Sequence, residues 1–125
     1  MKREIKFRVW DHNTDTMMIP DNFEFYDGEI GWIDASREAG PGSGNDGYPD
    51  QFEIMQYTGL HDKNGREIYE GDLVKNENGV LRVVEFHDGS FTLGDYYFGS
   101  IGAGRVLEVV GNIYEDPDLL EAQHD

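Results

Sequence analysis

The stretch Met55–Asp72, MQYTGLHDKNGREIYEGD, limits the fold of this chain more than any other part of the sequence. Within it, Asp62–Gly65 reads DKNG, a tight-turn sequence with extended segments on both sides. An Asn-Gly pair favours the primed turns of β-hairpins, because both residues tolerate positive φ. The stretch therefore predicts a β-hairpin, followed by a second turn that begins at Gly71.

Short β-prone segments divided by similar turns make up most of the remaining chain. In Glu4–Trp10 every second residue is apolar, the pattern of a half-buried strand. Turn-forming residues at 11–15 and a break at 20–22 then delimit the next segments. We expect these further strands before the middle of the chain: 16–19, 23–26 and 30–33, the last two as a hairpin through 27–29. The opening third thus predicts a β-meander.

The second half of the chain also consists of short β-prone segments separated by turns. The segments expected to be extended are 72–75, 80–86, 90–93, 105–110 and 112–114, with Gly111 allowing a bulge between the last two. Closely spaced short strands predict a small, strongly bent barrel rather than an open sheet. A short helix should follow, because Asp116 can cap it and Pro117 suits its first position.

Residues 37–49 interrupt the strand pattern with glycines, prolines and almost no apolar side chains. Such a composition is typical of a surface loop. We therefore divide the chain into an N-terminal β-lobe at 1–50, which ends in this loop, and a C-terminal β-barrel at 51–125. The expected fold class is mainly β.

Charge argues against nucleic acid as the main partner. The 125 residues carry a formal net charge of −16, so most of the chain repels phosphate. The exception is a candidate basic strand formed by Lys2, Arg3, Lys6 and Arg8. A nucleic-acid-associated barrel that uses this strand is the alternative function. An acidic surface that imitates a polyanion is a further possibility beside simple solubility.

Catalytic and metal-binding patterns are weak throughout. There is no cysteine, and the four histidines lack the spacing of a metal site. No serine occupies a nucleophile elbow. The segment Asp62–Glu67 resembles part of a calcium loop, but its glycine is misplaced and a hairpin turn explains it. We expect no enzyme activity, cofactor or metal.

The aromatic side chains supply the candidate contact surface. Neighbouring residues of an extended segment face opposite sides, so the aromatic run at 96–98 cannot be wholly buried. The candidate protein-contact residues are Tyr57, Tyr69, Tyr96, Tyr97 and Phe98. A small β-barrel can use such a surface to hold a peptide.

Three segments resemble the YopX-like proteins of phages and prophages. They are IKFRVWD at 5–11, QYTGLHDKNGREIYEGD at 56–72 and LEVVGNIYEDPDLLE at 107–121. The resemblance implies a C-terminal barrel of the SH3 type and a protein of a mobile element, and it supplies no catalytic or binding residues.

Together these features predict a non-enzymatic protein-binding module that acts on a host or phage protein, with self-association as the other expected contact. No apolar run reaches the roughly 20 residues of a membrane helix, and the absence of cysteine fits a reducing compartment. We expect the cytoplasm of a bacterial host and no membrane partner.

Overall fold

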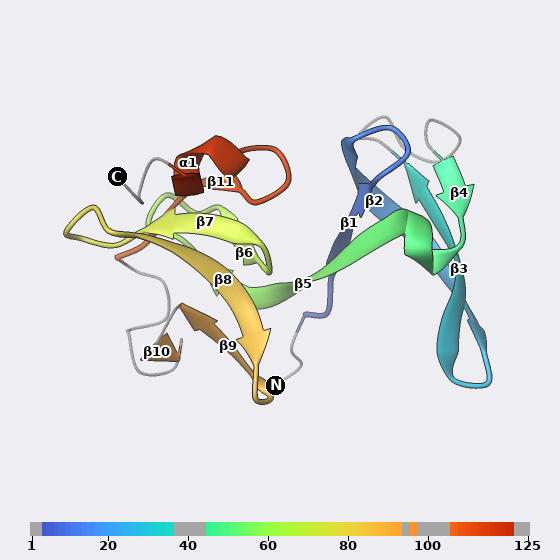
Figure 1. Cartoon of the computed structure of the whole chain (residues 1–125). Coiled ribbons are helices and arrows are strands. Elements are labelled where there is room, and N and C mark those ends of the chain that lie inside the picture. Colours follow the sequence, from blue (N-terminus) through green and yellow to red (C-terminus); the bar gives the residue numbers. More distant parts are fainter. Residues whose placement is uncertain (1–3, 37–44, 94–95, 98–105, 122–125) are drawn as a thin grey trace. The chain divides into compact units, whose positions relative to one another are not determined.

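Antiparallel strands make up most of the structure, a computed structural model that describes residues 4–36, 45–93, 96–97 and 106–121 (Figure 1). The chain forms two units, which we call the N-terminal unit (Lys6–Gln56) and the C-terminal unit (Met1–Ile5 with Tyr57–Asp125). The change from one unit to the other falls inside a strand, after Gln56. The sequence had placed the domain division at residue 50, within the turn-rich region.

The N-terminal unit is a meander with a returning strand. Its elements are β1 (Phe7–Asp11), β2 (Thr16–Tyr26), β3 (Glu29–Ser36), β4 (Asn45–Gly47), the 3₁₀ turn η1 (Pro49–Gln51) and the first part of β5 (Phe52–His61). The strands are ordered β4-β3-β2-β1-β5. One face carries the core, which consists of Val9, Met18, Ile33, Ala35 and Phe52. The predicted opening meander is present, and β5 extends it by pairing with β1.

Of two further predictions in this unit, one is confirmed and the other is wrong. The expected hairpin is confirmed, because Asp27 and Gly28 both have positive φ and Tyr26 pairs with Glu29. The expected break at 20–22 is wrong, since β2 continues through it. A register shift between Pro20 and Asn22 takes up the irregularity, and a bulge is a position where a strand tolerates proline.

The prediction of a loop at 37–49 is also wrong for the last residues of that segment. Residues 37–44 lie outside the described residues, whereas Asn45–Gly47 forms β4 along β3 and Pro49–Gln51 forms a 3₁₀ turn. Asn and Gly have low intrinsic strand preference. Hydrogen bonding to a strand already formed overrides that preference.

The C-terminal unit contains the other elements. They are β6 (Glu67–Tyr69), β7 (Asp72–Lys75), β8 (Leu81–His87), β9 (Ser90–Leu93), β10 (Tyr96–Tyr97), β11 (Glu108–Asn112) and α1 (Pro117–Glu121). Five of the strands form an antiparallel sheet in the order β10-β9-β8-β7-β11, and β6 pairs with the last part of β5. The core consists of Ile68, Val74, Val84, Leu93, Leu107 and Val109. Among the described residues, no pairing joins β10 to β11 and closes a barrel.

Several predictions for this unit are confirmed. The hairpin of β8 and β9 turns at Asp88 and Gly89, both with positive φ. The register of β11 against β7 shifts between Val109 and Gly111, as the glycine suggested. The helix begins at Pro117 after Asp116. Its expected apolar face is incomplete, since the side chain of Leu119 is 39% exposed.

The expected strand at 112–114 is wrong, because Asn112 ends β11 and turns the chain. Its side-chain oxygen accepts hydrogen bonds from the backbone N–H of Tyr114 (3.0 Å) and of Glu115 (2.8 Å). Its own backbone N–H donates to the Asp116 carboxylate at 3.1 Å. These side-chain bonds replace strand pairing with the turn that leads into α1.

The central hairpin has a different turn from the predicted one. Gly65 has a φ of 86°, but Asn64 does not have positive φ, so the turn is not of the primed kind. The backbone N–H of Gly65 donates to the carbonyl of Asp62 at 3.0 Å, and the Asp62 carboxylate accepts from the N–H of Asn64 and of Arg66. Asp at the first position and Gly at the fourth are typical of a type I turn.

The same turn occurs a second time, between β7 and β8. The side-chain oxygen of Asn76 accepts from the N–H of Asn78 at 2.9 Å and of Val80 at 3.0 Å. Gly79 has a φ of 77° and its N–H donates to the Asn76 carbonyl. Asparagine is therefore sufficient for the turn itself. The carboxylate of Asp62 makes an additional bond outside the turn.

The second oxygen of Asp62 joins the hairpin turn to β11. It accepts a hydrogen bond from the backbone N–H of Val109 at 2.9 Å. Beside it, the N–H of Lys63 donates to the carbonyl of Leu107 at 2.9 Å, and the Arg66 guanidinium donates to the carbonyl of Val109 at 3.3 Å. The Asp62 side chain is buried, with a residue exposure of 5%. It thus connects segments 47 positions apart.

Asp62→Asn should destabilise the C-terminal unit by about 1–3 kcal/mol. The amide can keep the turn bonds, as Asn76 does, but its NH₂ group would face the N–H of Val109, which loses its acceptor. Urea denaturation followed by far-UV circular dichroism measures the change, because Trp10 and Trp32 both lie in the N-terminal unit and their fluorescence would not report on the C-terminal one. The matched control is Asp88→Asn, at an exposed turn position with a φ of 49° that asparagine tolerates. Equal stability of the two variants would contradict this role of Asp62.

Acid should remove the contribution of Asp62. Burial works against its ionisation, but hydrogen bonds from the N–H of Val109, Arg66 and Asn64, with the nearby Arg66 charge, hold the pKa below its ordinary value of 3.8. A lowered native pKa stabilises the fold above the unfolded-state pKa and ceases to do so as pH falls through the native one. The stability difference between the wild type and Asp62→Asn should therefore shrink from about pH 5 to pH 3. A constant difference over that range would refute the linkage.

Candidate binding site

The predicted aromatic contact residues do not share one exposed surface in the described structure. Tyr57 is 3% exposed. The centroid of its ring lies 5.5 Å from that of Tyr69 and 5.9 Å from that of His61. Its hydroxyl lies 3.3 Å from Nδ1 of His61. Tyr57 is therefore an interior residue, and Tyr69 beside it is half-buried.

The other aromatic candidates are described only in part. Tyr96 and Tyr97 form β10, which pairs with Leu93 and Thr92 of β9, and their side chains lie outside the description. Phe98 lies outside the described residues altogether.

Of the described residues of the candidate basic strand, only Arg8 lies in a strand. Lys2 and Arg3 are outside the described residues, while Lys6 and Arg8 are half-buried. Arg8 belongs to β1, which has β2 on one side and β5 on the other. The register with β5 covers the whole of β1, including Arg8, whereas the register with β2 covers only Val9–Asp11.

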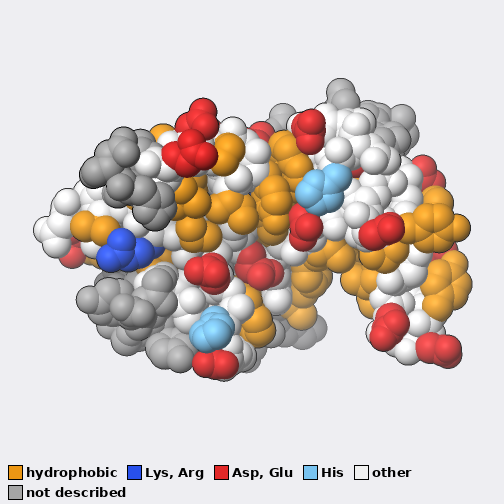
Figure 2. All heavy atoms as spheres, in the orientation of Figure 1, with side chains coloured by type: hydrophobic (Ala, Val, Ile, Leu, Met, Phe, Trp, Pro, Cys, Tyr) orange, Lys and Arg blue, Asp and Glu red, His pale blue; other side chains and the backbone are white. Residues whose placement is uncertain are grey.

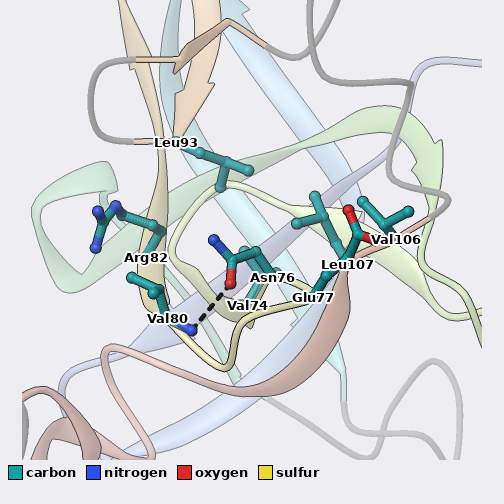
Figure 3. A pocket seen from close by; sticks show the side chains of 8 residues that line it. All are labelled: Val74, Asn76, Glu77, Val80, Arg82, Leu93, Val106 and Leu107. Carbon is teal, nitrogen blue, oxygen red and sulfur yellow. Dashed lines mark hydrogen bonds between the residues drawn. The ribbon is translucent and has the colours of Figure 1, made fainter.

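A hollow of about 480 Å³ in the C-terminal unit is the candidate site (Figure 3). Its walls come from the β7–β8 turn, the ends of β8 and β9, and the residues that lead into β11. The lining residues are Val74, Asn76, Glu77, Val80, Arg82, Leu93, Val106 and Leu107. All of them belong to the C-terminal unit.

The floor of the hollow is part of the core of the unit. Val74, Leu93 and Leu107 are at most 3% exposed and pack in the same apolar cluster. At the mouth, Val106 is 39% exposed. The hollow therefore offers apolar surface that continues from the interior to the solvent.

Polar side chains form the rim. Asn76 is held by the turn bond to Val80 that Figure 3 marks, and Glu77 beside it is exposed. The guanidinium of Arg82 donates to the carbonyl of Leu81 at 3.1 Å and points away from Leu93 and Leu107 in Figure 3. An apolar floor with a few polar groups at the edge is the usual composition of a ligand pocket.

The Asp62 connection positions one wall of this hollow. The N–H of Lys63 holds the Leu107 carbonyl, and the Asp62 carboxylate holds the N–H of Val109 two residues later. The exposed Val106 directly precedes this anchored segment. The hairpin turn, which contributes no lining residue, thus determines where Val106 and Leu107 lie.

The polar groups of the hollow are few. Among the described residues that line it there are one carboxylate, one guanidinium and one amide, and no histidine, serine or tyrosine. Within the described ranges there is no group of three or more His, Asp or Glu side chains arranged to hold a metal ion. Five of the eight lining residues are apolar, so the lining is best suited to an apolar group.

Comparison with known proteins identifies the family. The profile described as YopX protein matches residues 6–121. The chain belongs to the YopX family. A comparison with curated protein sequences finds no match.

Two solved structures resemble this YopX-family chain over nearly its whole length. The crystal structure of protein EF1440 from Enterococcus faecalis has 26% sequence identity and a TM-score of 0.72, and the match covers 95% of this chain and 99% of that one. Protein yopX from Bacillus subtilis has 21% identity and a TM-score of 0.60, with coverages of 94% and 98%. The second likeness shows the fold alone.

The family assignment agrees with the resemblance seen in the sequence, and all eight lining residues fall inside the matched range. Sequence reasoning missed every one of them as a site residue. Val74, Leu93 and Leu107 read as ordinary core positions, and nothing local marks Val106. None of the helices in the described residues is long and apolar enough to cross a membrane.

Proposed function

We propose that this YopX-family chain is a non-enzymatic protein-binding module of phage or prophage origin. It acts in the cytoplasm of a bacterial host, and its C-terminal unit works as a small SH3-like β-fold that holds an apolar segment of a host or phage protein. The observation that carries the proposal is the hollow beside β7 and β8, with the exposed side chain of Val106 at its mouth.

The energetics of such a contact are adequate for a specific interaction. Burying a side chain the size of valine or leucine contributes about 1.5–3 kcal/mol. One or two anchors in a preformed hollow, with polar groups at the rim to orient the segment, therefore suffice for a peptide complex. The floor is fixed by core packing, so little ordering is required on the side of this protein.

The surface charge favours a partner that is not nucleic acid. Acidic side chains occur across the face shown in Figure 2, over both units, and the formal net charge is −16. Phosphate backbones would be repelled by most of this surface. Lys6 and Arg8 are both half-buried, which limits the contact that their side chains can make with a phosphate backbone.

The test is selection of random peptides displayed on phage, followed by affinity measurement of the selected peptides with two matched variants. Val106→Asp places a charge at the mouth of the hollow, whereas Leu119→Asp places one on α1 at a residue that is equally exposed, 39% in both cases. We expect selected peptides to contain a bulky apolar anchor and to bind Val106→Asp at least about tenfold more weakly. Leu119→Asp should bind like the wild type.

Two outcomes would overturn the proposal. Selection that enriches no peptide above an unrelated control protein means that the hollow has no peptide ligand. Equal loss of affinity in Val106→Asp and Leu119→Asp means that added negative charge, and not the hollow, determines binding. Circular dichroism and thermal melting of both variants identify any change that comes from unfolding.

A further inference from the structure

The sheet of the N-terminal unit has an exposed aromatic surface opposite its core. Along β3, Ile33 and Ala35 point into the core, so Trp32 and Asp34 point to the other face. Tyr48 follows β4 and packs against Trp32, with ring centroids 5.0 Å apart and an edge-to-face angle of 82°. Tyr48 is nevertheless 66% exposed.

A second ring lies on the same sheet at the end of β2. A Cβ atom added at Gly31 would collide with the ring of Tyr26, so this ring lies directly over the glycine backbone. Tyr26 remains 61% exposed. A ring that rests on the sheet and is open to solvent presents its negative π-face to a partner.

Carboxylates are bonded to the polar edges of these rings. The hydroxyl of Tyr26 donates to Glu24 at 2.9 Å, and the indole N–H of Trp32 donates to Asp34 at 3.2 Å. The hydrogen bond to Glu24, together with the charge of Glu24, raises the pKa of Tyr26 above its ordinary 10.0. Each of these two carboxylates has a second oxygen that the bond to the ring does not use.

A further carboxylate lies directly across the sheet. Asp34 on β3 is the register partner of Asp46 on β4, and both face away from the core. Like charges directly opposite each other on neighbouring strands destabilise a sheet. In the described part of the chain, no Lys or Arg forms an ion pair with Glu24, Asp34 or Asp46. A cation between these side chains would relieve the repulsion.

We propose that this surface binds a basic, arginine-bearing segment of a partner protein. We call it the aromatic–acidic face, and it consists of Glu24, Tyr26, Trp32, Asp34, Asp46 and Tyr48. A guanidinium stacks on an aromatic ring and donates in its own plane, so one arginine can lie on a ring and bond a carboxylate at the same time. This face lies in the N-terminal unit and binds through charge and aromatic rings, whereas the hollow lies in the C-terminal unit and is apolar. The inference therefore holds whether or not the hollow binds a peptide.

The charge of the whole molecule supports a basic partner. A net charge of −16 concentrates cationic segments near the surface and accelerates their association. Charge alone would attract them everywhere, however. The rings beside the carboxylates of this face distinguish it from the rest of the acidic surface.

The experiment measures fluorescence anisotropy of a labelled synthetic peptide that alternates arginine with serine, on the full-length protein at physiological salt. A peptide with citrulline in place of arginine keeps the shape and removes the charge. We expect the arginine peptide to bind and the citrulline peptide not to bind. Tyr48→Ala and Asp34→Asn should each weaken binding by about threefold or more, and Tyr48→Phe, which keeps the ring, should restore it.

Matched controls separate this face from general attraction. Phe25→Ala removes an aromatic ring that is 60% exposed and pairs with the core-facing Ile30. Asp88→Asn removes one exposed carboxylate of the C-terminal unit. Both variants should bind the arginine peptide like the wild type. Val106→Asp, which alters the hollow and leaves the aromatic–acidic face unchanged, should do so as well.

Three results would overturn the inference. Losses that are equal in the face variants and the controls indicate non-specific attraction by net charge. Equal binding of the citrulline peptide removes the role of the cation. Displacement of the peptide by calcium, reversed by a chelator, assigns the carboxylates of Asp34 and Asp46 to a metal ion.

Discussion

The buried carboxylate of Asp62 is the contact on which the C-terminal unit depends. One oxygen closes the turn between β5 and β6, and the other holds the N–H of Val109 at the start of β11. Two of the three sequence segments that resemble the YopX-like proteins therefore meet at a single side chain. Because the carboxylate is buried, each of its bonds is made in a low-dielectric environment, where an unmade bond is costly.

The repeated turn shows what an aspartate adds to an asparagine. Asn76 forms the same local hydrogen bonds between β7 and β8 as Asp62 forms between β5 and β6. Only the carboxylate has a second acceptor oxygen, and it is directed at a distant strand. The Asp62 turn thus sets the position of the segment before β11, including Leu107 and Val106, while the Asn76 turn supplies Asn76 and Glu77 to the lining of the hollow.

The two proposed surfaces use different physical interactions. The hollow offers apolar area that a partner removes from water, a contact that depends little on salt. The aromatic–acidic face offers ring quadrupoles and carboxylates, so its contacts weaken as salt is added. Each surface lies within one unit, so neither depends on how the units are placed.

The sequence by itself determined the features whose causes lie within a few residues. They are the β-rich class, the hairpins at Asp27 and Asp88, the bulge near Gly111 and the start of α1 at Pro117. Positive φ, missing N–H groups and side-chain caps act locally, so residue order is enough to reveal them. Tertiary structure alone decided which backbone groups pair across long separations. It turned Asn45–Gly47 into a strand, placed Tyr57 in the interior and directed Asp62 to Val109. These outcomes depend on distant segments that supply hydrogen-bond partners and exclude water, and a local pattern contains neither.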